Sequence, residues 1–324
     1  MSSTPTTPPT TSPTADATTD TTRRGAFFVL AASLVGISFA APLIRLSTAD
    51  PLVIATWRLA FSMVIVAIAL IVTRGWRGYA RLQPRDYGLA AGAGVLLALH
   101  FWSWNASLRY TSVAASVALV NMQPVLIATV SALWLREPPS RRQWGGISLA
   151  VLGALIVGVA DVPGGVMAIG PALLGGEGGD SRRALFGDLL ALLGAATAAG
   201  YYLIGRRIRQ FLDLWPYVAL VYGAALLTCL LLVVVTGQSL APQPPKELLI
   251  FAGLAVGPML LGHTGMNWAL GHLPAFVVNL TTLGEPIGAT LLAALLPGIA
   301  EVPGFGTIAG GVLVLTGVLL AARK

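Results

Sequence analysis

Long apolar runs separated by short polar connections dominate the chain from residue 26 to residue 322. A helix rises about 1.5 Å per residue, so roughly 20 apolar residues cross a hydrocarbon core about 30 Å thick. This pattern predicts ten membrane-spanning helices, over 26–44, 51–72, 87–107, 112–134, 144–160, 185–205, 215–236, 247–268, 274–296 and 303–322. The sequence therefore predicts an all-α polytopic membrane protein with short loops.

The composition agrees with this pattern, because 56% of the residues are hydrophobic and only 10% are charged. A soluble domain usually carries about 25% charged residues. Residues 1–25 are different: they are rich in Thr and Pro and contain few apolar residues, so we expect a disordered tail there. This tail lacks the basic start and apolar centre of a signal peptide, so we expect the first span to be retained.

The Lys and Arg residues predict the orientation in the membrane, because cytoplasmic loops carry an excess of them. With the N-terminus inside, fourteen fall in inner segments and five in outer segments, and Arg58 lies within a span. This asymmetry predicts that both termini are cytoplasmic and agrees with an even number of crossings. We expect a multi-pass protein of the plasma membrane, the inner membrane of a bacterium. The net charge of +7 then reflects orientation, and we expect no nucleic-acid partner.

The polar landmarks occur twice along the chain. Laying residue i over residue i+162 pairs Asn105 with Asn267 and Pro124 with Pro286. This recurrence indicates a duplication of five spans. The two copies are residues 26–160 and 185–322, and the Gly-rich outer linker 161–184 lies between them. Because five is odd, the second copy enters the membrane from the opposite side, which gives two inverted five-helix repeats. Such repeats are typical of secondary transporters, whose substrate site lies near the midplane.

Glu285 is the most conspicuous charge within a span, and Pro286 follows it directly. The proline cannot donate a hydrogen bond to the Thr282 carbonyl, so we expect a helix kink there. The repeat-related pair is Gln123 and Pro124, which predicts a cavity with one acidic and one neutral wall. Glu285 is interpreted either as a substrate or proton-coupling group or as a hydrogen-bonded residue that joins neighbouring helices.

Two histidines occupy nearly matching positions in the two halves. His100 and Trp104 are four residues apart, as are His263 and Asn267, so each pair is expected to share one helix face. The repeat favours a substrate-binding or proton-handling role, whereas packing is the alternative for an isolated histidine. Trp104 is either a packing group or an aromatic wall for a ring-bearing substrate.

Arg58 lies about eight residues inside its span, too deep for its charge to reach the interface easily. It is interpreted either as a substrate-binding or coupling residue, through an ion pair with a group such as Glu285 or by binding an anion, or as an arginine satisfied by carbonyls at a helix end. The only cysteine, Cys229, is expected to be a small buried residue. The three histidines and this cysteine show no metal-ligand spacing, so no metal or other cofactor is expected. Spans 144–160 and 303–322 carry several glycines and are expected to be packing walls or the contact of a homodimer.

Several of these stretches resemble one known family. TWRL at 56–59, HFWSWNASLRYTSVAASVALVNMQPVLIATVSALWLREP at 100–138, and GHTGMNWAL with LPAFVVNLTTLGEPIGATLLAALL at 262–296 are similar to EamA-type members of the drug/metabolite transporter superfamily. The resemblance covers about residues 26–322, once per half. The second half departs from the pattern at LLPGIAEVP, where the first half has LREPP.

The resemblance implies ten helices in two inverted repeats around a central cavity. It implies that His100, Gln123, His263, Asn267 and Glu285 line this cavity, and that the substrate is a small molecule such as an amino acid or a drug-like compound. The expected activity is export by alternating access, coupled to protons through Glu285. The alternatives are an intramembrane lipid-modifying enzyme and an importer or exchanger of sugar-type metabolites.

Overall fold

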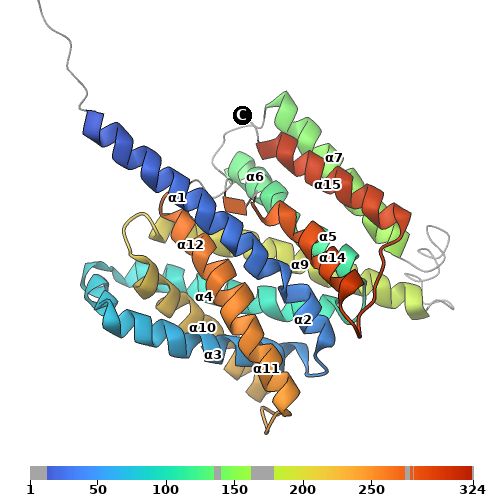
Figure 1. The fold of residues 1–324 in the computed structure, drawn as a ribbon, viewed down its shortest axis with the longest axis horizontal. Helices are drawn as coiled ribbons and strands as arrows, with labels where there is room; N and C mark the ends of the chain where they lie inside the picture. The colour runs from blue at the N-terminus through green and yellow to red at the C-terminus, as the bar shows by residue number, and fades with distance from the viewer. Residues whose placement is uncertain (1–12, 135–139, 162–178, 274–277, 280, 323–324) are drawn as a thin grey trace, which may run out of the picture.

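The protein is built from helices that pack side by side, with the two halves of the chain interleaved (Figure 1). The computed structural model describes residues 13–134, 140–161, 179–273, 278–279 and 281–322, and within these ranges no strand occurs. Residues 1–12 of the expected tail and most of the expected linker 161–184 lie outside the described ranges.

The first half contains seven α-helices in its described part, with a 3₁₀ turn, η1, after the third. Their bounds are α1 (Pro13–Ser38), α2 (Ala40–Leu46), α3 (Pro51–Val72), η1 (Gly75–Arg81), α4 (Pro84–Ser107), α5 (Val113–Val120), α6 (Gln123–Trp134) and α7 (Arg141–Asp161). Local caps explain several starts. The Asp50 carboxylate accepts a hydrogen bond from the Leu52 amide at 3.0 Å, and the Ser112 hydroxyl accepts one from the Ala115 amide at 3.1 Å.

The second half repeats this order with more irregular helices. Its elements are α9 (Gly179–Ile208), α10 (Leu214–Val235), α11 (Pro245–Leu254), the π-helical segment η2 (Ala255–Thr264), α12 (Gly265–Leu270), the 3₁₀ turn η3 (Thr282–Gly284), α14 (Glu285–Leu295) and α15 (Phe305–Ala322). Pro258 lies inside η2 and has no backbone N–H, so regular α-helical bonding is interrupted there.

Five helical segments of the described chain are long and apolar enough to cross a membrane: Gly25–Leu46, Pro51–Val72, Gly179–Ile208, Leu214–Val235 and Pro245–Leu270. Four shorter apolar helices accompany them. α1 begins at Pro13, within residues 1–25, where a disordered tail is expected. No proline follows within α1, so the helix of the first span can continue toward the N-terminus over these Thr and Ala residues.

The two proline sites also differ in detail from the expected kinks. The helix ends at Val120, and a new helix begins at Gln123 with Pro124 in its first turn. In the second half, η3 precedes a helix that begins at Glu285 with Pro286 in its first turn. Proline suits the first turn of a helix, where its missing N–H costs no hydrogen bond. Both prolines therefore restart a helix.

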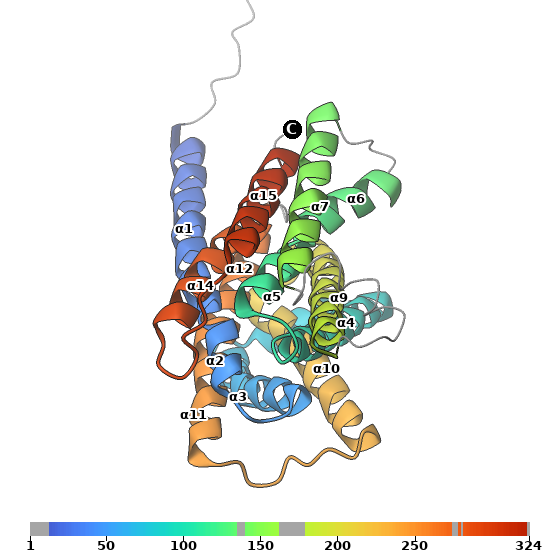
Figure 2. The same cartoon turned by 90° about the vertical axis from the view of Figure 1, so that its right-hand side faces the viewer.

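The glycine-rich helices α7 and α15 lie against each other along their length, in both views (Figures 1 and 2). A Cβ atom on Gly153 would lie 2.7 Å from the carbonyl oxygen of Gly310, and one on Gly310 would lie 2.8 Å from that of Gly153. The glycines thus allow close packing inside one chain. The remaining helices enclose the main core, which includes Leu59, Phe101, Tyr201 and Tyr222.

Candidate functional site

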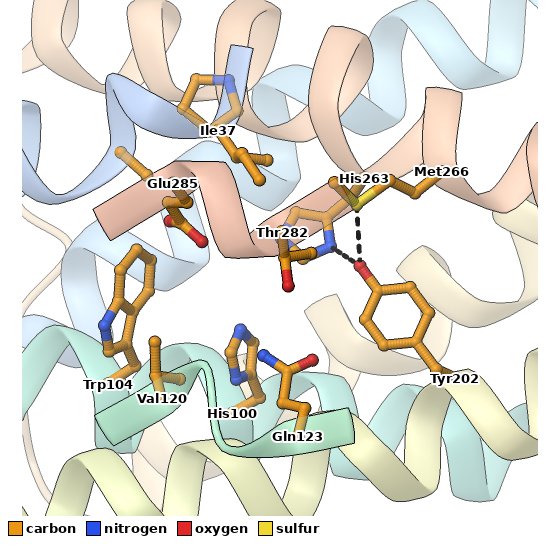
Figure 3. Close-up of a pocket in the computed structure, with 12 residues that line it drawn as sticks. Ile37, His100, Trp104, Val120, Gln123, Tyr202, His263, Met266, Thr282 and Glu285 are labelled. Atoms are coloured by element: carbon orange, nitrogen blue, oxygen red, sulfur yellow. Dashed lines mark hydrogen bonds between the residues drawn. The ribbon is translucent and has the colours of Figure 1, made fainter. Parts of the chain in front are cut away.

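A narrow cavity lies where α4, α5, α6 and α9 of one side face α1, η2, η3 and α14 of the other (Figure 3). About 20 Å³ of it is open to a water-sized molecule. Its lining residues are Ile37, Ala40, His100, Trp104, Val120, Gln123, Tyr202, Pro258, His263, Met266, Thr282 and Glu285. Five residues singled out from the sequence therefore meet in one place: His100, Trp104, Gln123, His263 and Glu285.

Glu285 faces this cavity from the first turn of α14 and is 7% exposed. Its Oε2 atom accepts a hydrogen bond from Asn121 Nδ2 at 3.3 Å. Asn121 lies in the break between α5 and α6, so the two interrupted helices touch through these side chains. No Lys or Arg forms an ion pair with Glu285 within the described ranges. The carboxyl group is thus buried without a basic partner, an arrangement that is costly inside a membrane.

His100 and Trp104 form the opposite wall, one turn apart on α4. The His100 Nδ1 atom donates a hydrogen bond to the Gly194 carbonyl at 2.9 Å, because a carbonyl oxygen can only accept. In a neutral ring the Nε2 atom is then an acceptor. The His100 ring stacks on Trp104 with 5.9 Å between centroids and 11° between planes.

His263 faces His100 from the π-helical segment η2, with 6.0 Å between the ring centroids. Tyr202 stacks on His263 at 6.4 Å, and its hydroxyl lies 3.4 Å from His263 Nδ1 and 3.3 Å from the Met266 sulfur. Figure 3 shows this tyrosine closing one end of the cavity. The histidine pair predicted from the repeat is therefore a spatial pair.

Arg58 is fully buried but does not line the cavity. Its guanidinium carbon lies 4.0 Å from the centroid of the Phe101 ring, and Nη2 lies 3.9 Å from the Met259 sulfur. Phe101 in turn places its ring edge-to-face with His263 at 5.2 Å. Nε and Nη1 have no hydrogen-bond partner in the described part of the chain. No ion pair joins Arg58 to Glu285 there, although the two charges interact electrostatically, and an aromatic face covers the guanidinium.

Asn267 also lies outside the cavity lining, although it is completely buried. Its Nδ2 atom donates to the hydroxyl oxygens of Tyr201 and Tyr222, the second at 3.4 Å. His263, one turn earlier, also contacts Tyr201, with 6.4 Å between the ring centroids, and it reaches the cavity lining as well. Asn267 thus lies against the same tyrosine but outside the lining.

Tyr202, Thr282, Met266 and Pro258 are lining residues that the sequence analysis did not single out. Pro258 offered a signal, because a proline inside a long apolar run predicts an irregular helix. Tyr202 and Thr282 are residue types that occur commonly in spans, so they gave no such signal. No group of three or more His, Cys, Asp or Glu that could hold a metal ion occurs among the described residues.

Comparisons with known proteins place the chain among membrane transporters. The sequence profile described as the EamA-like transporter family matches residues 23–159 and again residues 185–323, which shows two duplicated halves. An uncharacterized transporter of Archaeoglobus fulgidus is 21% identical over 298 residues, which cover 91% of this chain and 97% of that protein. One protein of known crystal structure has a similar fold, with a TM-score of 0.62, 19% identity, and coverage of 92% of this chain and 96% of that one.

Proposed function

Because the chain belongs to the EamA-like transporter family, we propose that it exports a small organic solute by alternating access around the cavity at Glu285. The observation that carries this proposal is the buried Glu285 carboxyl group, which faces a void between the two halves and has no basic partner among the described residues. A bound solute or a proton supplies the missing partner at this position.

The proposed topology has ten spans in two inverted five-helix repeats, with both termini cytoplasmic and the chain in the plasma membrane. The fourteen Lys and Arg residues of the inner segments support this orientation. The restarts at Pro124 and Pro286 support the inverted repeat, because broken helices at related positions of two halves are typical of transporter binding sites. Residues 26–160 and 185–322 are the proposed repeats.

An exchanger of phosphorylated sugars is less favoured by the lining of the cavity. A phosphate group is usually held by Lys or Arg. None of the described residues that line the cavity is basic apart from His100 and His263.

The first prediction concerns Glu285→Gln in purified protein reconstituted into liposomes. The amide keeps the shape of the side chain but cannot exchange a proton or carry a charge at physiological pH, so flux should no longer respond to an imposed pH gradient. The measurement is uptake of a labelled solute with and without the gradient. Asp180→Asn, an exposed change outside the cavity, serves as the control. Unchanged coupling in Glu285→Gln would remove Glu285 from the mechanism.

The solute is identified by growth of an overexpressing strain on a panel of amino acids, amines and drug-like compounds. An exporter should confer resistance to its substrate, and Glu285→Gln should abolish that resistance. If no compound separates the overexpressing strain from the empty-vector strain, export of these classes is excluded.

A further inference from the structure

The cavity offers more hydrogen-bond acceptors than its neighbours satisfy. Glu285 provides two carboxylate oxygens, and its one described hydrogen bond comes from Asn121. Gln123 Oε1 is buried and has no hydrogen-bond partner in the described ranges, and Gln123 itself is 6% exposed. His100 Nε2 is a further acceptor in the neutral ring, since Nδ1 is engaged with Gly194. A ligand that fits these groups must bring N–H or O–H donors.

Apart from His100 and His263, no described residue of the same lining could carry a positive charge beside an anionic ligand. No described lining residue is Lys or Arg, and the Arg58 guanidinium lies against the Phe101 ring outside the lining. The donors that do reach the wall are neutral: the Gln123 amide and Trp104 Nε1, which is buried and has no hydrogen-bond partner in the described ranges. A carboxylate placed here would lie beside the Glu285 carboxyl group without a counter-charge, which is unfavourable in a buried site.

The aromatic rings of the wall favour a cation. Trp104 and His100 stack with 11° between their planes, and Tyr202 stands at the other end of the cavity. The face of an aromatic ring attracts an ammonium group that lies within about 6 Å of its centroid. The cavity leaves only about 20 Å³ open to a water-sized molecule, so it must widen to admit even a compact solute.

We propose that the cavity binds a small organic amine in its ammonium form that carries no carboxylate, with Glu285 as its counter-charge and Gln123 as a second acceptor. This ligand is the exported solute, so the inference rests on the proposed function and narrows its substrate class. The proposal predicts that the cavity binds an amine such as tyramine or putrescine in preference to the amino acid of the same carbon skeleton.

The test compares matched pairs of compounds on the purified full-length protein in detergent. Radiolabelled tyramine is bound first, and unlabelled tyramine, tyrosine, putrescine and ornithine compete with it. We expect each amine to compete at least about tenfold better than its parent amino acid, because the added carboxylate has no partner. Equal or better competition by the amino acids would overturn the proposal.

Two variants test the residues. Glu285→Gln should weaken tyramine binding at least about tenfold, whereas Asp180→Asn should leave it unchanged. Gln123→Glu adds a carboxylate at the position related to Glu285 by the repeat, and it should shift preference from tyramine toward the diamine putrescine. This gain remains informative if Glu285→Gln does not fold. Unaltered preference in folded Gln123→Glu would remove Gln123 from the site.

Separate measurements of amine binding and of transport distinguish a failure of this inference from a failure of the proposed function. If amines bind in detergent but are not moved across liposomes, the proposed transport fails and the amine site stands. If liposomes move a carboxylated solute while no amine binds, transport stands and the amine site is wrong.

Discussion

Among individual residues, Arg58 places a charge in a fully buried position. A charged residue at the centre of a membrane helix costs roughly 2.5–3.5 kcal/mol on insertion scales. Here the guanidinium is fully buried, and Phe101 covers it at 4.0 Å. The Phe101 ring also touches His263, so the charge stands one ring behind the cavity wall. From there the Arg58 charge also interacts electrostatically with Glu285, His100 and His263.

A double-mutant cycle between Arg58 and Phe101 tests whether the ring stabilises the buried guanidinium. Phe101→Leu removes the aromatic face and should lower the free energy of unfolding by about 2 kcal/mol, from the cation–π interaction and the lost ring contacts. In an Arg58→Met background the same change should cost about 1 kcal/mol less, because the charge is gone. Equilibrium unfolding in SDS measures both. Equal costs in the two backgrounds would show that the ring does not stabilise the guanidinium.

At the scale of the element, the pair α7 and α15 depends on glycines that face each other. A Cβ atom on Gly310 would lie 2.8 Å from the Val157 amide nitrogen and 2.8 Å from the Gly153 carbonyl oxygen. Both are backbone atoms, so the helices must move apart to admit it. The neighbouring Gly311 has no atom within 4 Å of the equivalent position.

These two adjacent glycines give a matched pair of variants. Gly310→Ala should destabilise the protein by about 1–3 kcal/mol, the usual cost of overpacking a tight contact. Gly311→Ala should be neutral or stabilising by up to roughly 1 kcal/mol, since alanine favours the helix. Thermal unfolding in detergent compares the two. A similar loss of stability in both variants would mean that the packing of α7 on α15 is not the cause.

The order of the helices was predictable because apolar length is a strong signal, and α3 spans Pro51–Val72 as expected. The two family matches confirm the resemblance that the motifs at 56–59, 100–138 and 262–296 suggested. The two prolines, Pro124 and Pro286, predict where the helices are interrupted. The structure has a helix start at each of these places instead of a kink. The π-helical turn around Pro258 was not foreseen, because hydropathy reports burial and not helical pitch. Asn267, which the resemblance places in the cavity lining, hydrogen-bonds Tyr201 and Tyr222.

In the whole molecule, polar contacts join the two halves at one end of the bundle. Glu247 accepts hydrogen bonds from the Ser47 hydroxyl and from the Thr48 amide, the second at 2.9 Å. At the same end Arg45 forms an ion pair with Glu301 at 3.3 Å. Asp86 stands at the start of α4, as Glu247 does at the start of α11. Its described contacts are with its own neighbours in the chain, Gln83 and Arg85. The repeat-related end thus lacks a described counterpart of the Glu247 contact.

This difference predicts the effect of Glu247→Gln. Loss of charge-assisted hydrogen bonds, worth about 1.5–3 kcal/mol, should favour the form that is open at this end. The opening is measured with the variant Thr282→Cys in a Cys229→Ser background. The measured quantity is the rate at which the new thiol reacts with a membrane-impermeant thiol reagent. We expect the reaction to become about tenfold faster from the side of the connection between α2 and α3.

The control for this experiment is Asp86→Asn, which alters the repeat-related carboxylate at the opposite end. It should not accelerate the reaction from the side that Glu247 closes. An unchanged rate in Glu247→Gln would show that Glu247 does not hold the bundle shut.

The π-helical segment η2 has a further consequence for how the two halves diverged. Pro84 lies 24 positions before Leu108, whereas Pro245 lies 25 positions before its repeat partner Leu270. The second copy has therefore gained a residue between these landmarks, and a π-helical bulge accommodates such an insertion without breaking the helix. The wide turn takes up the extra residue locally, so the helix beyond it can keep its register. Beside the cavity the two halves thus differ in chain length as well as in the exchange of glutamine for glutamate.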